Sequence, residues 1–317
     1  MKKLSRFILI ILTVLSGSVF AQSAGTNSFE FLRTQYSPRG AALGGNLIAI
    51  KNDPQALLYN PASLAGNTES LWSIAYVDHL LDFQAGHLFF GKPVKGIGNL
   101  YAGLIYLNFG SFDETDEFGR ATGQTFNAAD IAFTAGLSNP LGSGFDYGLS
   151  FKLIHSTLEN YNASALALDA GIIYTAESLD NLQFGVSLLN LGGTIDNYTD
   201  HTENLPRMLQ VGFAKRLAHL PLLFTGSLTD LTASEENFAD RFKRFSLGGE
   251  FDVSEMIKFR LGYQNDVNQS VKPLGRSVIS GFSLGLGINW NRLQLAYAYS
   301  NFGDLGSQNH IGISGAL

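Results

Sequence analysis

The stretch FSLGLGINW, Phe282 to Trp290, is followed after Asn291 and Arg292 by LQLAYAYS, Leu293 to Ser300. In both stretches every second residue carries a large apolar side chain, and the residues between them are small or polar. A period of two is typical of a β-strand with one apolar and one polar face. These residues therefore predict two strands joined by a short turn.

The same period of two recurs from about residue 70 to the end of the chain. Most of the segments have the roughly 9–11 residues that a tilted membrane strand requires, and bacterial single-chain barrels usually have an even number of strands. Counting the segments predicts fourteen strands, near residues 70–79, 82–92, 99–111, 127–138, 145–156, 164–175, 182–191, 207–216, 221–229, 243–252, 257–264, 279–290, 293–301 and 308–317.

The connections between these strands alternate in length. Turns such as NPLGSG, residues 139–144, are short. The first hairpin, near His79 to Leu81, is an exception to the alternation, because it is short where a long loop is expected. Outer-membrane barrels have short periplasmic turns and longer extracellular loops. The alternation therefore favours a membrane barrel over a soluble exported β protein, which stays the alternative. The long polar connections are Phe112 to Gln124, Gly192 to Pro206, Leu231 to Arg241 and Asn265 to Ser277.

The composition agrees with a wall that meets lipid. Glycine accounts for 35 of 317 residues, aromatic residues for 12% and charged residues for only 15%, whereas ordinary globular domains carry roughly 25% charged residues. The chain has no cysteine, which excludes thiolate metal sites and redox chemistry. Its net charge of −6 is spread along the chain without a basic patch, so we expect no nucleic-acid partner.

The first 21 residues have the pattern of a secretory signal peptide. A basic start precedes the apolar run Phe7–Leu15, and small or compact residues lead to Ala21. This run is too short to span a membrane as a helix. We therefore expect a signal peptide at residues 1–21, removed before Gln22 or near Ala24, an N-terminal segment and hatch at 22–69, and an outer-membrane barrel at 70–317.

The stretch SPRGAALGGNLIAIKNDPQALLYNPASLA, Ser37 to Ala65, lacks the strand period. Its small residues allow another backbone to approach closely. Pro54 can begin a helix, and Asn60-Pro61 is expected to stop that helix and turn the chain toward the first strand. A barrel of fourteen strands encloses more space than its own side chains fill. We therefore predict an all-β fold, a 14-stranded antiparallel transmembrane β-barrel with a short N-terminal helical hatch in the lumen.

This stretch resembles the N-terminal hatch of the FadL-like outer-membrane proteins. Within that superfamily, the sequence FEFLRTQYSPRGAALGGN, with Phe29, Phe31 and Leu32 ahead of the hatch, is similar to the PorV/PorQ family of Bacteroidetes, and to its PorQ-like members in particular. The residues that match the hatch motif are Arg39, Gly44, Gly45, Asp53, Asn60, Pro61, Ala62 and Leu64.

The resemblance implies a non-catalytic outer-membrane component of the type IX secretion system. Such a protein would anchor a surface-exposed PorZ-like partner in the cell-surface complex that attaches cargo, together with PorU-like and PorV-like members. The other interpretation is a FadL-like transporter of hydrophobic small molecules. In the first case the long loops would hold the partner, and the candidate residues are Asp113, Glu114, Asp196, Tyr198, Glu235, Phe238 and Lys272.

Motifs for catalysis or metal binding do not emerge from the sequence. Its six histidines lack the spacing of metal ligands, and it contains no H-E-x-x-H, G-x-S-x-G or Walker motif. We therefore predict no enzyme activity and no catalytic, cofactor-binding or metal-binding residues. Lys152 and Arg260 are expected to face the lumen, where they could line a pathway or tie the wall to the hatch; we favour the tie.

Overall fold

The computed structural model describes residues 28–198, 204–232, 238–271 and 280–317. The predicted signal peptide, residues 1–21, lies outside the described residues, as do Glu235 and Lys272. Within the described part of the chain, no helix has the length and apolar character needed to cross a membrane.

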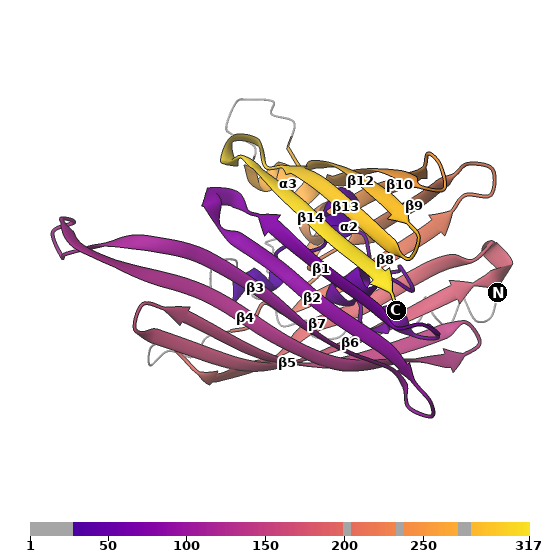
Figure 1. Ribbon diagram of the computed structural model, residues 1–317, viewed down its shortest axis with the longest axis horizontal. Coiled ribbons are helices and arrows are strands. Elements are labelled where there is room, and N and C mark those ends of the chain that lie inside the picture. Colours follow the sequence, from indigo (N-terminus) through magenta and orange to yellow (C-terminus); the bar gives the residue numbers. More distant parts are fainter. Residues whose placement is uncertain (1–27, 199–203, 233–237, 272–279) are drawn as a thin grey trace.

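The described residues form one closed barrel of fourteen antiparallel strands, which confirms the predicted fold (Figure 1). Each strand pairs with its neighbours along the chain, and the first strand closes the barrel by pairing with the last. The strands are β1 (Leu71–Asp78), β2 (Gln84–Val94), β3 (Gly98–Thr115), β4 (Ala121–Gly142), β5 (Phe145–Leu158), β6 (Tyr161–Ala176), β7 (Leu182–Asp196), β8 (Met208–Arg216), β9 (Leu222–Leu228), β10 (Phe245–Asp252), β11 (Ile257–Gln264), β12 (Phe282–Trp290), β13 (Leu293–Asn301) and β14 (Ser307–Ala316).

The two ends of the barrel differ in their connections. We call the end with connections 95–97, 143–144, 177–181, 217–221, 253–256 and 291–292 the turn end. The opposite end, with connections 79–83, 116–120, 159–160, 197–207, 229–244, 265–281 and 302–306, is the loop end. Short helices lie in several of these connections: η4 (Leu80–Asp82), η6 (Phe238–Lys243), α3 (Asn265–Val271) and η7 (Gly303–Leu305) at the loop end, and η5 (Glu177–Leu179) at the turn end.

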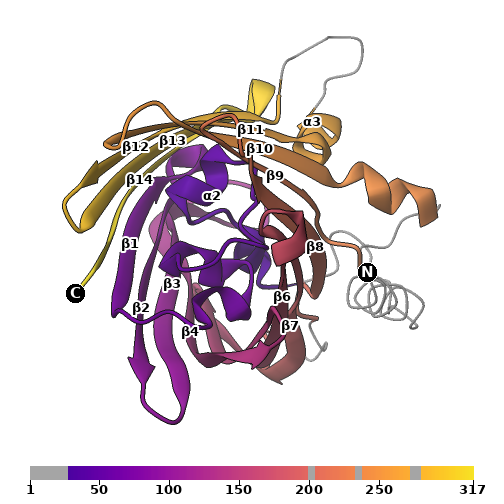
Figure 2. The same cartoon turned by 90° about the vertical axis from the view of Figure 1, so that its right-hand side faces the viewer.

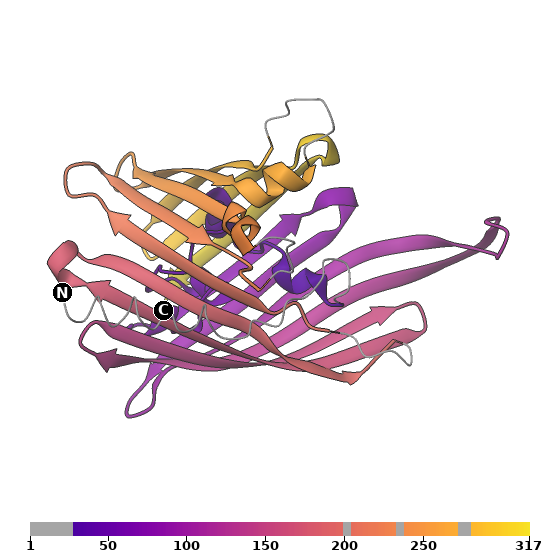
Figure 3. The same ribbon diagram turned by 180° about the vertical axis from the view of Figure 1, so that it is seen from behind.

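Two of the predicted loops are wrong because strands continue through them. Residues 112–124 form the end of a long hairpin in which β3 and β4 are joined by residues 116–120 alone. Cross-strand pairing extends the hairpin: Phe112 lies opposite Phe126, with their rings stacked 5.4 Å apart. Similarly, β7 continues to Asp196, well into the predicted loop 192–206. Figure 3 shows the β3–β4 hairpin reaching far beyond the other strands.

The wall has its apolar face outside and its polar face inside. On β12, Leu284 and Leu286 point outward and are nearly half exposed, whereas Ser283 on the opposite face of the same strand is 2% exposed. The same inversion recurs on other strands, where Ser73, Glu250 and His310 are buried on the lumen side. An apolar outer surface over a polar interior is the pattern of barrels that span a membrane.

The lumen contains the N-terminal segment, residues 28–69, which we call the hatch (Figure 2). Its helices are η1 (Glu30–Arg33), α2 (Pro38–Ala42), η2 (Pro54–Leu58) and η3 (Pro61–Leu64). Nearly all of its residues from Tyr36 to Ala65 are buried. The barrel therefore has a core of its own, formed between the hatch and the inner face of the wall.

Candidate functional site

Three helices of the hatch begin in the same way. Ser37, Asp53 and Asn60 each precede a proline, and each side-chain oxygen accepts a hydrogen bond from the backbone N–H two or three residues later, at 2.8–2.9 Å. Proline suits the first helical position because its missing N–H would have no partner there. As expected, the helix that Pro54 begins ends just before Asn60-Pro61, at Leu58. The expectation that this pair leads directly to the first strand is wrong, because it begins η3 before the chain reaches β1.

The glycine pair makes the sharp turn after α2. Gly44 and Gly45 have φ of +65° and +80°, a conformation that side chains rarely allow. The N–H of Gly45 donates to the carbonyl of Gly40 at 2.7 Å, which closes the turn. A Cβ on Gly44 would lie 3.0 Å from the carbonyl oxygen of Tyr263 in β11. The pair therefore combines a left-handed turn with a close contact between hatch and wall.

The wall receives the hatch through glycines on its inner face. A Cβ on Gly148 of β5 would overlap the backbone of Pro61, and a Cβ on Gly248 of β10 would lie 2.6 Å from the carbonyl oxygen of Leu43. The hatch backbone thus approaches the strands more closely than any side chain would permit. We use the name glycine seat for all wall glycines at which a Cβ would meet hatch atoms, of the backbone or of a side chain: Gly91, Gly148, Gly171, Gly185, Gly212, Gly248, Gly262, Gly285 and Gly312.

A buried ion-pair network joins the hatch to β10 and β11. The Arg39 guanidinium donates to Asp53 at 2.8 Å and, through two nitrogens, to the carboxylate of Glu250 at 2.9 Å. Glu250 also accepts from Nε of Arg260 at 2.8 Å, and Lys258 lies 3.6 Å away. A bidentate arginine–carboxylate pair fixes the geometry as well as the charge. Glu250 is therefore the point at which hatch and wall share charges.

Other contacts hold the hatch around its circumference. The Asn60 amide donates to the carbonyl of Ile48 at 2.8 Å and faces the carbonyls of Ile172 and Val186 in the wall at 3.3 and 3.4 Å. Lys51 forms an ion pair with Asp146 of β5. Ala62 and Leu64 are completely buried. The matched motif residues therefore fold the hatch and attach it to the barrel.

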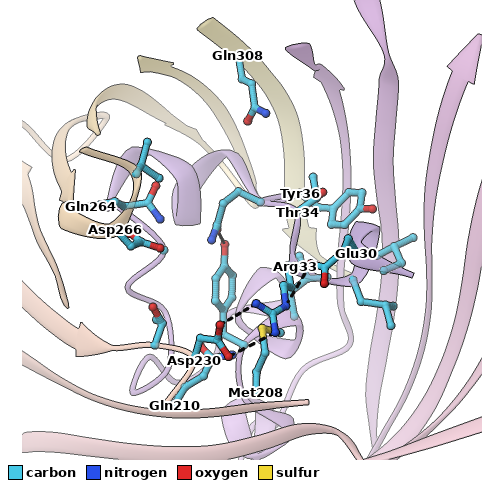
Figure 4. A pocket seen from close by; sticks show the side chains of 18 of the residues that line it. Glu30, Arg33, Thr34, Tyr36, Met208, Gln210, Asp230, Gln264, Asp266 and Gln308 are labelled. Carbon is cyan, nitrogen blue, oxygen red and sulfur yellow. Dashed lines mark hydrogen bonds and ion pairs between the residues drawn. The ribbon is translucent and has the colours of Figure 1, made fainter. Parts of the chain in front are cut away.

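Between the hatch and the loop end lies a cavity of about 350 Å³, which we call the vestibule (Figure 4). Its apolar lining includes Leu57 and Leu58 of the hatch and Phe89 and Ile105 of the wall. Polar side chains lie on the other sides, among them Gln210, Gln264 and Gln308. The lining therefore offers an apolar surface and several hydrogen-bonding groups, the usual character of a small-molecule site.

Charges in the vestibule centre on Asp230. Arg33 of the hatch donates to its carboxylate at 2.7 Å (Figure 4). The Arg244 guanidinium lies 3.2 Å from the same carboxylate. Burial raises the pKa of the Asp230 carboxyl, an effect that these two arginines partly offset. Burial also raises the pKa of Asp266 at the start of α3. The Arg33–Asp230 pair attaches the beginning of the hatch to the loop after β9.

The structure separates the two lumen-facing cations. Arg260 reaches the hatch through Glu250, as the predicted tie requires. For Lys152 the predicted tie is wrong: it lines the vestibule and pairs with wall residues, Asp169 at 3.0 Å and Asn190 at 2.8 Å. A bulge between β6 and β7, where Leu168 and Ala170 change register, brings Asp169 and Asn190 together.

The candidate partner residues fall on separate elements. Asp113 and Glu114 lie together on the projecting part of β3, and Asp196 is exposed at the end of β7. Tyr198 turns inward instead, where its hydroxyl donates to Ser156. Phe238 begins η6, and Glu235 and Lys272 lie outside the described residues.

Sequence reasoning missed three features of this site. The first is Glu250, which stands at an inward position of β10. A carboxylate at such a position is a usable signal, because it needs a cation such as the hatch arginine as its partner. The glycine seat was visible as glycines at inward strand positions, but not as a surface that receives the hatch. Asp230 gave no signal, because its role depends on Arg33 and Arg244, which are distant in sequence from one another.

Solved structures with a similar barrel include two toluene transporters and a FadL homologue. The toluene transporter TodX of Pseudomonas putida superposes with a TM-score of 0.59 at 13% identity, covering 89% of this chain and 97% of that chain. The toluene transporter TbuX of Ralstonia pickettii gives 0.56 at 11% identity, covering 89% and 96%. A FadL homologue of Pseudomonas aeruginosa gives 0.52 at 12% identity, covering 92% and 97%.

This chain has the fold of the FadL-like outer-membrane barrels. No protein-family model and no curated protein matches its sequence. At such low identity the likeness in structure shows the fold alone. The function has to be inferred from the residues of the vestibule and the loop end.

Proposed function

We propose that the chain is an outer-membrane barrel that takes hydrophobic small molecules into the vestibule and passes them toward the hatch. The observation that carries this proposal is the vestibule itself, a cavity of about 350 Å³ with apolar hatch and wall residues on one side. Its volume falls in the range of small-molecule sites. The fold shared with two toluene transporters supports the same function.

In this function the hatch is the barrier at the base of the vestibule. Leu57 and Leu58 present an apolar floor to a solute, while Arg39 and Asp53 lie on the turn-end side of the same segment. A solute can pass only when some hatch contacts open. A second cavity lies on this turn-end side, between Asn52–Pro54 and β12–β14.

A cavity-filling variant tests this function. Thr134 of β4 lines the vestibule and its neighbour Phe133 faces outward, 53% exposed. Thr134→Trp should fill part of the cavity and reduce the uptake of radiolabelled toluene by cells at least about tenfold, because the added ring occupies solute space. Phe133→Trp places the same ring in the membrane and should leave uptake unchanged. Equal uptake by both variants and by cells without the protein would contradict transport through the vestibule.

A second function is favoured by the loop end. The β3–β4 hairpin stands well clear of the barrel, as expected for a surface that holds another protein. The resemblance of the hatch sequence to the PorV/PorQ family points in the same direction. On this hypothesis the chain is a non-catalytic anchor of the type IX secretion system, binding a PorZ-like protein alongside PorU-like and PorV-like members at the cell surface.

The two functions predict different losses on deletion of the chain. An anchor predicts that the PorZ-like protein or secreted cargo leaves the cell surface and appears in the medium, with toluene uptake unchanged. A transporter predicts the reverse. Fractionation of cells followed by immunoblotting measures the first effect, and the uptake assay measures the second.

A further inference from the structure

The hairpin of β3 and β4 continues past the barrel as an isolated ribbon. The last pair between β2 and β3 is Gln84 with Asn108, and the last pair between β4 and β5 is Ala128 with Leu158. Within the described part of the chain, the strand residues 110–115 and 121–126 pair only across this hairpin, from Gly110 opposite Ala128 to Thr115 opposite Ala121. We call residues 110–126 the ribbon. Both of its edges therefore present backbone N–H and C=O groups without a neighbouring strand.

The tip of the ribbon is held in one conformation by Asp116. Its carboxylate accepts hydrogen bonds from the backbone N–H groups of Phe118 and Arg120, each at 2.9 Å, and from Nε of Arg120 at 2.8 Å. These hydrogen bonds lower the pKa of the Asp116 carboxyl, and the bond from the Arg120 backbone has the largest effect. The Arg120 guanidinium lies 5.0 Å above the Phe118 ring. An ordered tip loses less conformational entropy on binding than a mobile one would.

The charge on the ribbon has one dominant sign. Asp116 and Arg120 neutralise each other, whereas Asp113, Glu114 and Glu117 have no cation of the described chain paired with them. Phe118 at the tip is 72% exposed. The ribbon thus combines free strand edges, an acidic surface and one exposed aromatic ring.

We propose that the ribbon binds an extended, lysine- or arginine-rich segment of a partner protein, which adds as a third strand along one free edge. Strand addition supplies backbone hydrogen bonds, and the carboxylates select a basic sequence. This inference rests on the anchoring function proposed as the second candidate. It assigns to that function a site and the chemistry of its partner.

The charge also disfavours a second copy of this chain as the occupant. Two ribbons joined edge to edge would bring their unpaired carboxylates together, and like charges on neighbouring strands are destabilising. A basic strand replaces that repulsion with attraction. The added strand would also cover one of the open edges. A two-stranded hairpin alone is only marginally stable in water, so a third strand would stabilise the ribbon.

A peptide titration tests the proposal on the full barrel in detergent micelles. The probe is a fluorescein-labelled peptide of eight residues in which lysine and valine alternate. Neutralising the unpaired acids, in D113N/E114Q/E117Q, should weaken its binding at least about tenfold. The matched control E177Q/E255Q removes exposed acids at the turn end and should bind the peptide as the wild type does. Equal binding to the wild type and to D113N/E114Q/E117Q would overturn the proposal.

Two further measurements separate strand addition from simple charge attraction. A peptide of the same charge with proline at two central valine positions cannot complete the ladder, and it should bind at least about tenfold more weakly. Hydrogen exchange should slow at residues 110–115 or 121–126 when the alternating peptide binds. Equal binding of the proline peptide, or exchange unchanged on both edges, would contradict a third strand.

Failure of this inference differs from failure of the anchoring function. If cells lacking the chain release the surface partner but cells with D113N/E114Q/E117Q retain it, the partner binds another part of the loop end and the ribbon proposal is wrong. If cells lacking the chain also retain the partner, the anchoring function itself is wrong.

Discussion

The two halves of the lumen are built differently. In the turn-end half the hatch lies directly on the wall, through most of the glycine seat and the Arg39–Glu250 ion pair. In the loop-end half the same segment leaves the vestibule open, and Arg33–Asp230 is its main charged contact with the loops. Close packing and buried charge fix the first half, whereas the second half has room for a ligand. The hatch motif therefore holds the fold together, and the open space of the vestibule lies toward the loop end.

The largest expected effect comes from removing the shared carboxylate. Glu250→Ala leaves Arg39 and Arg260 without their common partner in a buried site, which costs about 3–5 kcal/mol. The hatch should loosen, so trypsin should cleave after Arg39 or Lys51 in the folded barrel. Glu255→Ala, an exposed carboxylate at the turn end, is the control and should resist cleavage like the wild type. Equal resistance of both variants would mean that the network does not hold the hatch.

The next effect concerns the glycine seat. Gly148→Ala places a methyl group against the backbone of Pro61, so η3 must shift at a cost of about 1–3 kcal/mol. Gly193→Ala on β7 adds the same methyl group where nothing lies within 4 Å. The temperature at which the gel mobility of the folded barrel changes should fall for the first variant only. A similar fall for both would show that glycine acts through the strands rather than through the hatch.

A smaller effect is expected in the loop-end half. Arg33→Gln removes the ion pair with Asp230, where Arg33 is 27% exposed, and the expected loss is about 1 kcal/mol. Residues 30–33 should then exchange their amide hydrogens faster, while residues 54–64 stay protected. Arg292→Gln breaks a pair that is exposed on both sides and serves as the control. Faster exchange throughout the hatch would contradict the independence of the two halves.

The smallest effect on the barrel is expected from shortening the ribbon. Replacing residues 114–124 by Asn-Gly retains the Phe112–Phe126 pair and removes only residues that lie outside the barrel. The free energy of unfolding should stay within about 0.5 kcal/mol of the wild type. The temperature at which the gel mobility of the barrel changes should therefore be nearly the same. A barrel that no longer closes would show that the ribbon takes part in folding.

The fold could be predicted because strand periodicity is a local property. The alternation in Phe282–Trp290 appears in every strand that has lipid outside and polar groups inside, so counting segments gave the fourteen strands. The ends of β3, β4 and β7 could not be located in this way. Residues 112–124 are acidic and read as a loop, but pairing of Phe112 with Phe126 carries the ladder through them.

The hatch was predictable in part. The pairs Ser37-Pro38 and Asp53-Pro54 combine a capping side chain with a proline, which indicates the start of a helix from sequence alone. What each helix contacts depends on residues far along the chain. Arg39 meets Glu250 across 211 residues, and Arg33 meets Asp230 across 197. No local pattern encodes such pairs, so the vestibule and its charges became visible only in the fold.

Hydrogen exchange on the hatch within a lipid bilayer tests the central claim most directly. The amides of residues 37–65 should exchange as slowly as those of the wall strands, because the hatch is packed on the glycine seat and held by Glu250. The vestibule side, residues 30–34, should exchange faster. Rapid exchange throughout residues 37–65 in the folded barrel would contradict a fixed hatch and the division of the lumen that follows from it.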